Sequence, residues 1–324
     1  MKLRIALILL FSFTILIMLT GCTPEKEEQN SSQEKEQEQE VTEEAYDIKK
    51  AEKQQISNIY GLGYPGNDDA LYTAEEDGLK FYKDGQWFEQ NKNKHMYTGF
   101  QAVENGFISS GKPAEGAGLR SPLGIIKSDD KGATLSQIKF YGKDQFYFVA
   151  AGFSGETLYI ISQEPESELG AGVFRSTDKG ENWEPVELEG MESDTLGMIA
   201  VHPSKEGMMA MSTRSGIFLS NDFGKTVQRV SDPVMTTALA FTEDRLIYSS
   251  VENEKILLKS LDLASLETEG LDIPFLSYDN PITYIAANYK KAGTISFSTY
   301  LYDIYESADS GEHWNQLLKN GRIK

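Results

Sequence analysis

Short apolar runs separated by turn-forming residues fill the chain from about residue 56 to the C-terminus. Residues 145–149 (Gln-Phe-Tyr-Phe-Val) and 158–161 (Leu-Tyr-Ile-Ile) are typical, because each is rich in aromatic or β-branched side chains and lies close to Gly, Asp, Ser or Pro. Such runs predict β-strands joined by tight turns. No window sustains the apolar spacing of a helix over about 12 residues, so the pattern indicates an all-β domain.

The N-terminus has a different pattern. Lys2 and Arg4 precede an uncharged apolar run over residues 5–19, and the sequence Leu-Thr-Gly-Cys follows at once and ends at Cys22. A run of 15 residues is shorter than the roughly 20 needed to span a membrane. The segment resembles a bacterial lipoprotein signal peptide with its lipobox. That resemblance implies removal of residues 1–21, a diacylglycerol on Cys22, and an extracellular protein anchored to the outer face of the bacterial cell membrane.

Residues 22–54 carry 11 acidic and 5 basic side chains among many Gln and Ser residues. Such a segment has too few apolar groups to offset the entropy of ordering, so we expect a disordered tether, although residues 43–55 are compatible with a helix. Cys22 is the only cysteine, so the exported domain at 55–324 has no disulfide.

One motif recurs within this domain. Residues 176–183 and 307–314 fit Ser-x-Asp-x-Gly-x-x-Trp, and residues 128–135 and 220–227 are weaker copies with an aliphatic residue in place of Trp. The defining residues are Ser128, Asp130, Gly132, Ser176, Asp178, Gly180, Trp183, Ser220, Asp222, Gly224, Ser307, Asp309, Gly311 and Trp314.

These copies resemble the Asp-box, or bacterial neuraminidase repeat (BNR repeat). Together with decayed copies at Asp84 and Asp262, the aspartates recur in steps of 40 to 48 residues, the size of one four-stranded propeller blade. We therefore expect a β-propeller of six blades, with seven as the alternative. The resemblance covers residues 56–324 and implies that the boxes are structural turns, with Gly at a positive φ, on the face opposite the usual binding site.

Members of this group include sialidases, other glycoside hydrolases, sortilin-like receptors and a photosystem assembly factor, so the fold does not settle the function. A sialidase-like site uses three arginines, the first near the start of the domain. This chain has no arginine between Arg4 and Arg120, which argues against sialidase activity. Another glycoside hydrolase needs only two carboxylates about 5 to 9 Å apart, and remains the alternative to a binding protein.

Propellers usually bind ligands where the loops after the second and fourth strands of each blade converge around the central channel. Two long loops, 111–124 and 164–172, belong to neighbouring blades, so we expect a binding rim over blades two and three. The alternative for any single carboxylate is simple solvation of the surface. The candidate ligand-binding residues are Glu115, Arg120, Glu166, Glu168, Arg214, Tyr278 and Asp279.

The remaining chemistry is limited. His95, His202 and His313 are scattered, and no phosphate-binding loop is present, so we expect no metal site, no Ser-His-Asp triad and no cofactor. The net charge is −19, of which −15 belongs to residues 55–324. This charge disfavours nucleic acid and suits a neutral or cationic glycan, peptide or protein ligand. We expect a monomeric, membrane-anchored binding protein.

The lipobox generates a direct prediction. Replacing the thiol in Cys22→Ala removes the atom that would accept the diacylglycerol, so the variant should accumulate as an unprocessed precursor. Metabolic labelling with a fatty acid and gel mobility measure both effects. A variant that is matured to the wild-type size and still carries label contradicts the lipoprotein interpretation.

Overall fold

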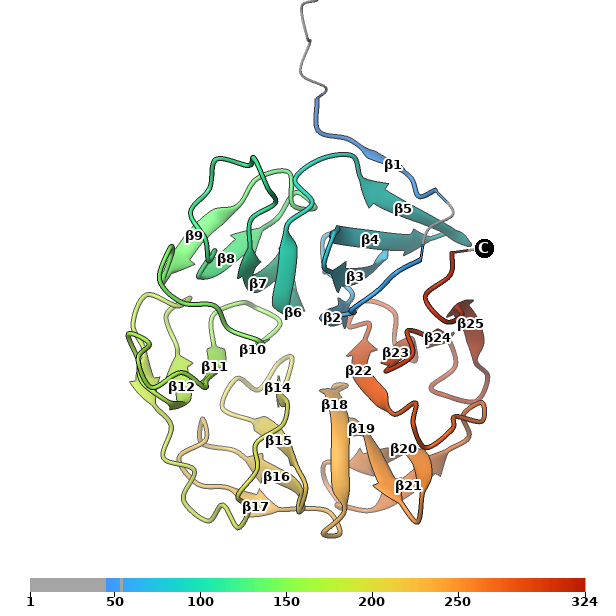
Figure 1. The fold of residues 1–324 in the computed structure, drawn as a ribbon. Helices are drawn as coiled ribbons and strands as arrows, with labels where there is room; N and C mark the ends of the chain where they lie inside the picture. Colours follow the sequence, from blue (N-terminus) through green and yellow to red (C-terminus); the bar gives the residue numbers. More distant parts are fainter. Residues whose placement is uncertain (1–44, 53–54, 324) are drawn as a thin grey trace, which may run out of the picture. The chain divides into compact units, whose positions relative to one another are not determined.

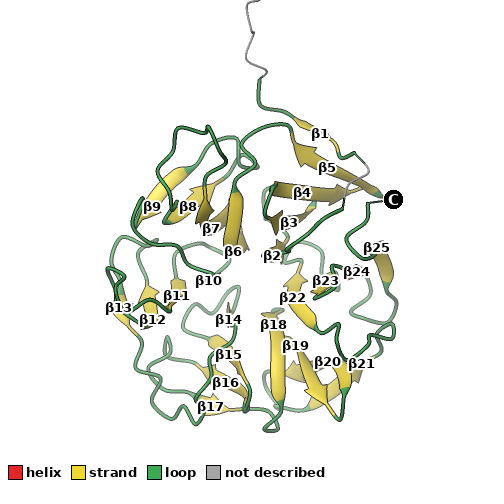
Figure 2. Ribbon diagram, viewed as in Figure 1, coloured by secondary structure: helices red, strands yellow, loops and turns green. Residues whose placement is uncertain are grey.

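Six antiparallel sheets make up the computed structural model, which describes residues 45–52 and 55–323 (Figure 2). The predicted signal peptide and Cys22 lie outside the described residues. The described residues belong to one unit, Ala45–Lys324. No helix suitable for crossing a membrane occurs within the described ranges.

The first sheet contains β1 (Ile48–Lys50), β2 (Gly61–Gly63), β3 (Leu71–Glu75), β4 (Gly78–Lys83) and β5 (Gln86–Gln90). The second contains β6 (Met96–Val103), β7 (Gly106–Lys112), β8 (Ile125–Ser128) and β9 (Ser136–Lys139). The third contains β10 (Phe148–Ala151), β11 (Leu158–Ser162), β12 (Gly172–Ser176) and β13 (Glu184–Pro185). The other three contain β14 (Ile199–Val201), β15 (Met209–Thr213), β16 (Gly216–Ser220), β17 (Gln228–Arg229); β18 (Met235–Phe241), β19 (Arg245–Glu252), β20 (Lys255–Asp262), β21 (Thr268–Leu271); and β22 (Ile282–Ala287), β23 (Ile295–Thr299), β24 (Ile304–Ser307), β25 (Asn315–Leu318).

The six sheets stand around a ring as the blades of a propeller (Figure 1). Within each blade, four consecutive strands follow one another outward, and the first of them, β2, β6, β10, β14, β18 or β22, lies nearest the centre (Figure 1). The predicted all-β class and the predicted six four-stranded blades are confirmed. The last blade takes all its strands from the C-terminal segment.

Blade one has a fifth strand that the sequence did not clearly indicate. β1 pairs antiparallel with β5, where Lys49 lies opposite Glu89, and the Ala51 N–H donates to the Trp87 carbonyl over 2.9 Å. The helix considered for residues 43–55 is therefore wrong at residues 48–50, which form a strand. The open edge of β5 offers unpaired backbone groups, and opposite charges across the strands favour the pairing. Pairing starts at Ile48, upstream of the predicted domain start at residue 55.

The core is divided into six clusters of buried side chains, one at each interface between neighbouring blades. β11 shows how one strand serves two of them. Leu158 and Ile160 pack towards blade two, whereas Tyr159 and Ile161 pack towards blade four. Successive side chains on a strand point to opposite faces. A blade buried on both faces therefore needs continuous apolar runs, as the sequence shows.

The ring closes between blades one and six without exchange of a strand. Tyr64 donates its hydroxyl to Glu306 Oε2 over 2.6 Å and lies 2.6 Å from Ser296 Oγ. The indole N–H of Trp87 donates to the Leu317 carbonyl over 3.2 Å. Side chains of both blades share one apolar cluster, so closure rests on packing supported by these hydrogen bonds.

The four Ser-x-Asp-x-Gly turns connect the third and fourth strands of their blades. In the turn at 176–183, the Asn182 N–H donates to Asp178 Oδ1 over 2.9 Å, and the Gly180 N–H donates to Ser176 Oγ over 2.8 Å. Lys179 and Gly180 have φ angles of 63° and 90°, a conformation that favours glycine. The hydrogen bonds that Asp178 accepts, first from the backbone and side chain of Asn182 and then from Ser176, lower its pKa to about 2, so the carboxylate stays ionised within the turn.

Trp183 fastens one of these turns to the core. Its ring is half-buried against Phe140, and its N–H donates to the Gly180 carbonyl over 2.9 Å. Trp183→Ala should therefore lower the free energy of unfolding by about 2 to 3 kcal/mol, since only part of the ring is buried. Trp183→Phe should recover most of the packing. Urea denaturation compares the two, and equal losses for both variants would show that packing is not the cause.

Candidate functional site

The propeller has two distinct faces. Turns from the first to the second strand and from the third to the fourth strand of each blade emerge on one side, the turn face, which carries the four Ser-x-Asp-x-Gly turns. The other connections emerge on the opposite side, the loop face. This division follows from the antiparallel order of the strands in every blade.

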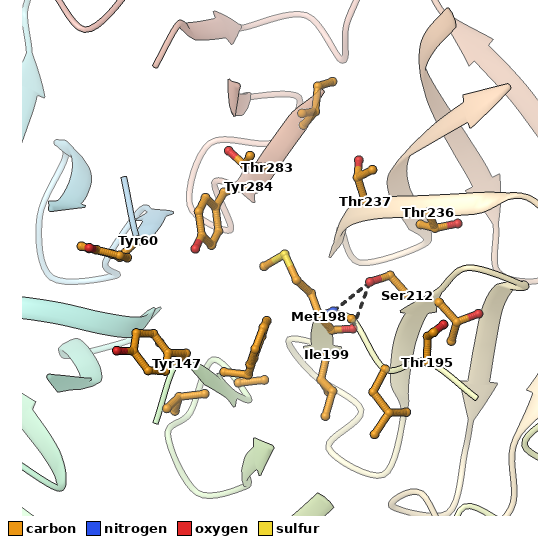
Figure 3. A pocket seen from close by; sticks show the side chains of 18 of the residues that line it. Tyr60, Tyr147, Thr195, Met198, Ile199, Ser212, Thr236, Thr237, Thr283 and Tyr284 are labelled. Atoms are coloured by element: carbon orange, nitrogen blue, oxygen red, sulfur yellow. Dashed lines mark hydrogen bonds between the residues drawn. The ribbon is translucent and has the colours of Figure 1, made fainter. Parts of the chain in front are cut away.

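A central cavity of about 610 Å³ opens among the innermost strands on the loop face (Figure 3). All six blades contribute to it, and the volume falls within the range of ordinary ligand pockets. The residues whose side chains define its chemistry are Tyr60, Phe100, Gln101, Tyr147, Phe148, Thr195, Leu196, Met198, Ile199, Ser212, Arg214, Met235, Thr236, Thr237, Thr283 and Tyr284.

Local irregularities in three innermost strands shape this cavity. The strand pairing shifts between Thr98 and Gln101 in β6, between Thr236 and Ala238 in β18, and between Ile282 and Tyr284 in β22. A β-bulge leaves residues outside the ladder and redirects their side chains. The residues omitted from the pairing all line the cavity; they are Gly99, Phe100, Thr237 and Thr283.

The lining combines apolar surface with hydroxyl groups. Tyr60, Tyr147 and Tyr284 lie towards one side of the cavity (Figure 3). Burial raises the pKa of Tyr284 to about 12, so its hydroxyl stays protonated and able to donate. The buried hydroxyls of Thr236 and Thr237 have no hydrogen-bond partner. Arg214 is the one charged side chain among the described lining residues.

An aromatic contact crosses the ring on the turn face. Phe153, in the β10–β11 turn, meets Tyr289, in the β22–β23 turn, with ring centroids 4.7 Å apart. These turns belong to blades three and six, which lie opposite each other (Figure 1). A contact between opposite blades must cross the axis, so the aromatic pair obstructs the channel at the turn face and leaves the loop face as the entrance.

The structure separates the residues predicted to bind ligand. Arg214 alone lines the central cavity. Tyr278 and Asp279 are exposed on the loop before β22 and do not line it. Glu115 and Glu166 are exposed at the tips of the two long loops.

Those two long loops border a second hollow of about 370 Å³ between blades two and three. Its lining includes Lys112, Lys143 and Glu164, but not the four residues predicted on these loops. Glu168 instead accepts a 2.5 Å hydrogen bond from Lys143, which lowers the pKa of its carboxyl. The backbone N–H of Arg120 donates to the Tyr141 hydroxyl over 2.7 Å. A hollow thus lies between the two long loops, but residues other than the predicted ones line it.

The cavity residues missed by the sequence interpretation lie at the starts of inner strands rather than in long loops. Tyr147 precedes β10, whereas Thr237 and Thr283 lie within β18 and β22. The available signal was the pair Thr236-Thr237, two adjacent hydroxyl residues inside an otherwise apolar strand. A break in the expected alternation of this kind can mark a bulge.

Glu75 is a carboxyl whose pKa is raised, to about 7, chiefly because it is buried. It ends β3, and its Oε1 lies 3.9 Å from Lys80 Nζ, which is itself bonded to Glu89 over 2.8 Å. Glu75 does not line the central cavity. It belongs to a buried ion cluster of blade one and not to a pair of catalytic carboxylates in the channel.

Asp309, Glu312 and His313 form an exposed group on the turn face whose ligand atoms lie within 4.8 Å of one another. His313 Nδ1 and Asp309 Oδ2 are 2.7 Å apart. The same carboxylate oxygen in the turn at 176–183 accepts the side-chain N–H of Asn182. His313 therefore occupies the position of a turn-stabilising donor, and we assign no metal to this group.

Comparisons with known proteins agree with the fold. A family model described as Sortilin, neurotensin receptor 3 (Sortilin-Vps10) matches residues 124–273. A search of curated protein sequences finds no match. The family match, which covers less than half of the chain, and the folds of solved structures support a β-propeller similar to those of sortilin-like proteins.

Three solved structures illustrate the likeness. The GH74 xyloglucanase from Xanthomonas campestris has 14% identity and a TM-score of 0.54 over 85% of this chain and 47% of its own. The tricorn protease has 12% identity and a TM-score of 0.57 over 83% of this chain and 27% of its own. The nidogen/laminin complex has 10% identity and a TM-score of 0.54 over 73% of this chain and 88% of its own. This chain spans less than half of the xyloglucanase and of the tricorn protease.

The buried carboxyl of Glu75 predicts a pH dependence of stability. Its folded-state pKa of about 7 exceeds its ordinary value of 4.5, so the folded chain keeps a proton that the unfolded chain loses. Wild-type stability should fall as the pH rises between these values. Glu75→Gln removes this loss. The free energy of unfolding of the variant minus that of wild type should therefore be about 1 to 3 kcal/mol higher at pH 8 than at pH 4.5. Urea denaturation at pH 4.5 and pH 8 tests this prediction, with Glu115→Gln, an exposed carboxyl in another blade, as the control. A Glu75→Gln difference from wild type that is equal at the two pH values would contradict it.

Proposed function

We propose that this chain is an exported, lipid-anchored binding protein that takes an uncharged part of its ligand into the central cavity. The carrying observation is the cavity itself, which all six blades line and three β-bulges shape. Anchoring is supported by the lipobox ending at Cys22, and the acidic segment after it would hold the propeller away from the membrane surface.

The lining favours an apolar or hydroxyl-bearing group. Tyr60, Tyr147 and Tyr284 offer rings for packing and hydroxyls for hydrogen bonds. Thr236 and Thr237 offer buried hydroxyls without partners, which a ligand would satisfy. A polyanion is opposed by the charge of −15 on residues 55–324.

A glycoside hydrolase is the second candidate, because several structural neighbours are GH74 enzymes. Their likeness to this chain extends to the fold alone. Hydrolysis by the usual mechanism needs two carboxylates facing the same bond. No Asp or Glu occurs among the described residues that line the central cavity, so binding without hydrolysis is the better-supported function.

Filling the cavity tests the proposal. Thr237→Phe places a ring where a half-buried side chain now lines the cavity and breaks no hydrogen bond of the Thr237 side chain. The full chain in mild detergent is first screened against a library of random linear 12-residue peptides and a glycan array. The hits should then bind the variant at least tenfold more weakly, while its thermal midpoint stays near the wild-type value.

Leu266→Phe on the turn face is the matched control and should bind as wild type. Hits that bind Thr237→Phe and wild type equally, or no hit from either library, would overturn the proposed function. Release of reducing sugar from a bound glycan would favour the hydrolase instead.

A further inference from the structure

Four exposed side chains form an apolar ledge beside the central cavity, made of Phe275, Tyr278, Tyr300 and Leu301. They come from two connections on the loop face, the one before β22 and the one between β23 and β24. Phe275 is 92% exposed, and Tyr278 and Tyr300 are 60% and 62% exposed. Together these two connections expose aromatic and aliphatic surface to water on one part of the loop face, and exposed apolar surface of this kind marks an interaction site.

Two hydrogen bonds join the loops that carry the ledge. The Leu301 N–H donates to Asn280 Oδ1 over 2.7 Å, and Asn280 Nδ2 donates to Asp303 Oδ2 over 3.1 Å. Asn280 and Asp303 are themselves buried. Two buried polar side chains therefore join the two loops near Leu301, which limits the movement of one loop against the other and reduces the entropy lost on binding a partner.

Exposed apolar side chains are distributed unevenly between the two faces. Of the exposed large hydrophobic residues in the described part of the chain, Leu266 alone lies in a third-to-fourth-strand turn, on the turn face. All the others lie on the loop face; they are Leu119, Tyr147, Leu196, Met235, Phe275, Tyr278, Tyr300 and Leu301. Solvation of a surface gives no reason for such an imbalance, whereas an interface on one face does.

The ledge is continuous with the central cavity. The Tyr300 N–H donates to the Pro281 carbonyl over 2.9 Å, and Pro281 lines the cavity. Leu196 and Met235, which line it from blades four and five, are also exposed. A partner that enters the cavity would thus rest its flanking groups on the ledge.

We infer that the ligand of the proposed binding function is a polypeptide segment, which places one apolar side chain in the central cavity and packs its neighbouring residues on the ledge. This inference rests on the proposed function. The exposed aliphatic side chains of Leu196, Met235 and Leu301 match the apolar side chains of a polypeptide better than a sugar, whose hydroxyl groups need polar partners. Asp279 on the ledge loop and the charge of −15 further favour a segment that carries Lys or Arg.

The peptide library and glycan array described above supply the probes. Linear 12-residue peptides should be enriched on the full chain in detergent, and their shared residues should be aromatic or aliphatic with Lys or Arg beside them. The binding should be at least tenfold weaker for Phe275→Ser and for Tyr300→Ser, because interface energy concentrates in a few aromatic anchors. Leu266→Ser, which removes an exposed apolar side chain from the opposite face, should bind as wild type.

Each outcome separates the two ideas. Peptide binding that is weakened by Thr237→Phe but not by the two ledge variants would overturn the role of the ledge and leave the proposed function of the cavity intact. Binding of glycans alone, blocked by Thr237→Phe, would overturn the polypeptide ligand only. Peptide binding that is weakened by the ledge variants but not by Thr237→Phe would overturn the proposed function of the cavity. Wild-type dimers that Phe275→Ser dissociates, measured by light scattering, would show instead that the ledge joins two copies of this chain.

Discussion

Closure of the ring is the constraint on which the rest of the structure depends. Every blade buries both faces against its neighbours, so an unsealed gap between blades one and six would expose two apolar faces at once. Tyr64 lies at this seam and bonds to Glu306 and Ser296 of the last blade. The added strand β1 covers the outer edge of blade one. Only a closed ring brings the six inner strands together around one cavity.

The two faces differ in the hydrogen-bonding groups and apolar side chains that they leave available to a ligand. Turns such as 176–183 use their carboxylate, hydroxyl and amide groups on one another, which leaves little hydrogen-bonding capacity for a ligand. The loop face keeps unpartnered hydroxyls at Thr236 and Thr237 and exposes apolar rings such as Phe275. The turn face is therefore arranged as a scaffold. The loop face is arranged as a surface whose covering by a partner would lower the free energy.

The sequence predicted the fold far better than the site. The repeat of Ser, Asp and Gly marks local turns whose bonds lie within eight residues, so the four turns, together with the decayed copies at Asp84 and Asp262, give the six blades. The cavity depends on residues far apart in the chain, such as Tyr60, Tyr147 and Tyr284, that meet only after closure. Long acidic loops drew attention to Glu115 and Glu166, which stay in solvent. β1 was missed because its pairing depends on the free edge of β5 and not on its own composition.

Hydrogen–deuterium exchange of the full chain, with and without its bound peptide or glycan, tests the division between the faces most directly. Binding in the central cavity should slow exchange in the segments around Tyr147, Thr237 and Thr283, which come from three different blades and meet only at the channel. Exchange in the turn at 176–183 should not change. Protection confined to that turn and its three counterparts, with the inner strands unaffected, would contradict the assignment of the loop face as the functional face.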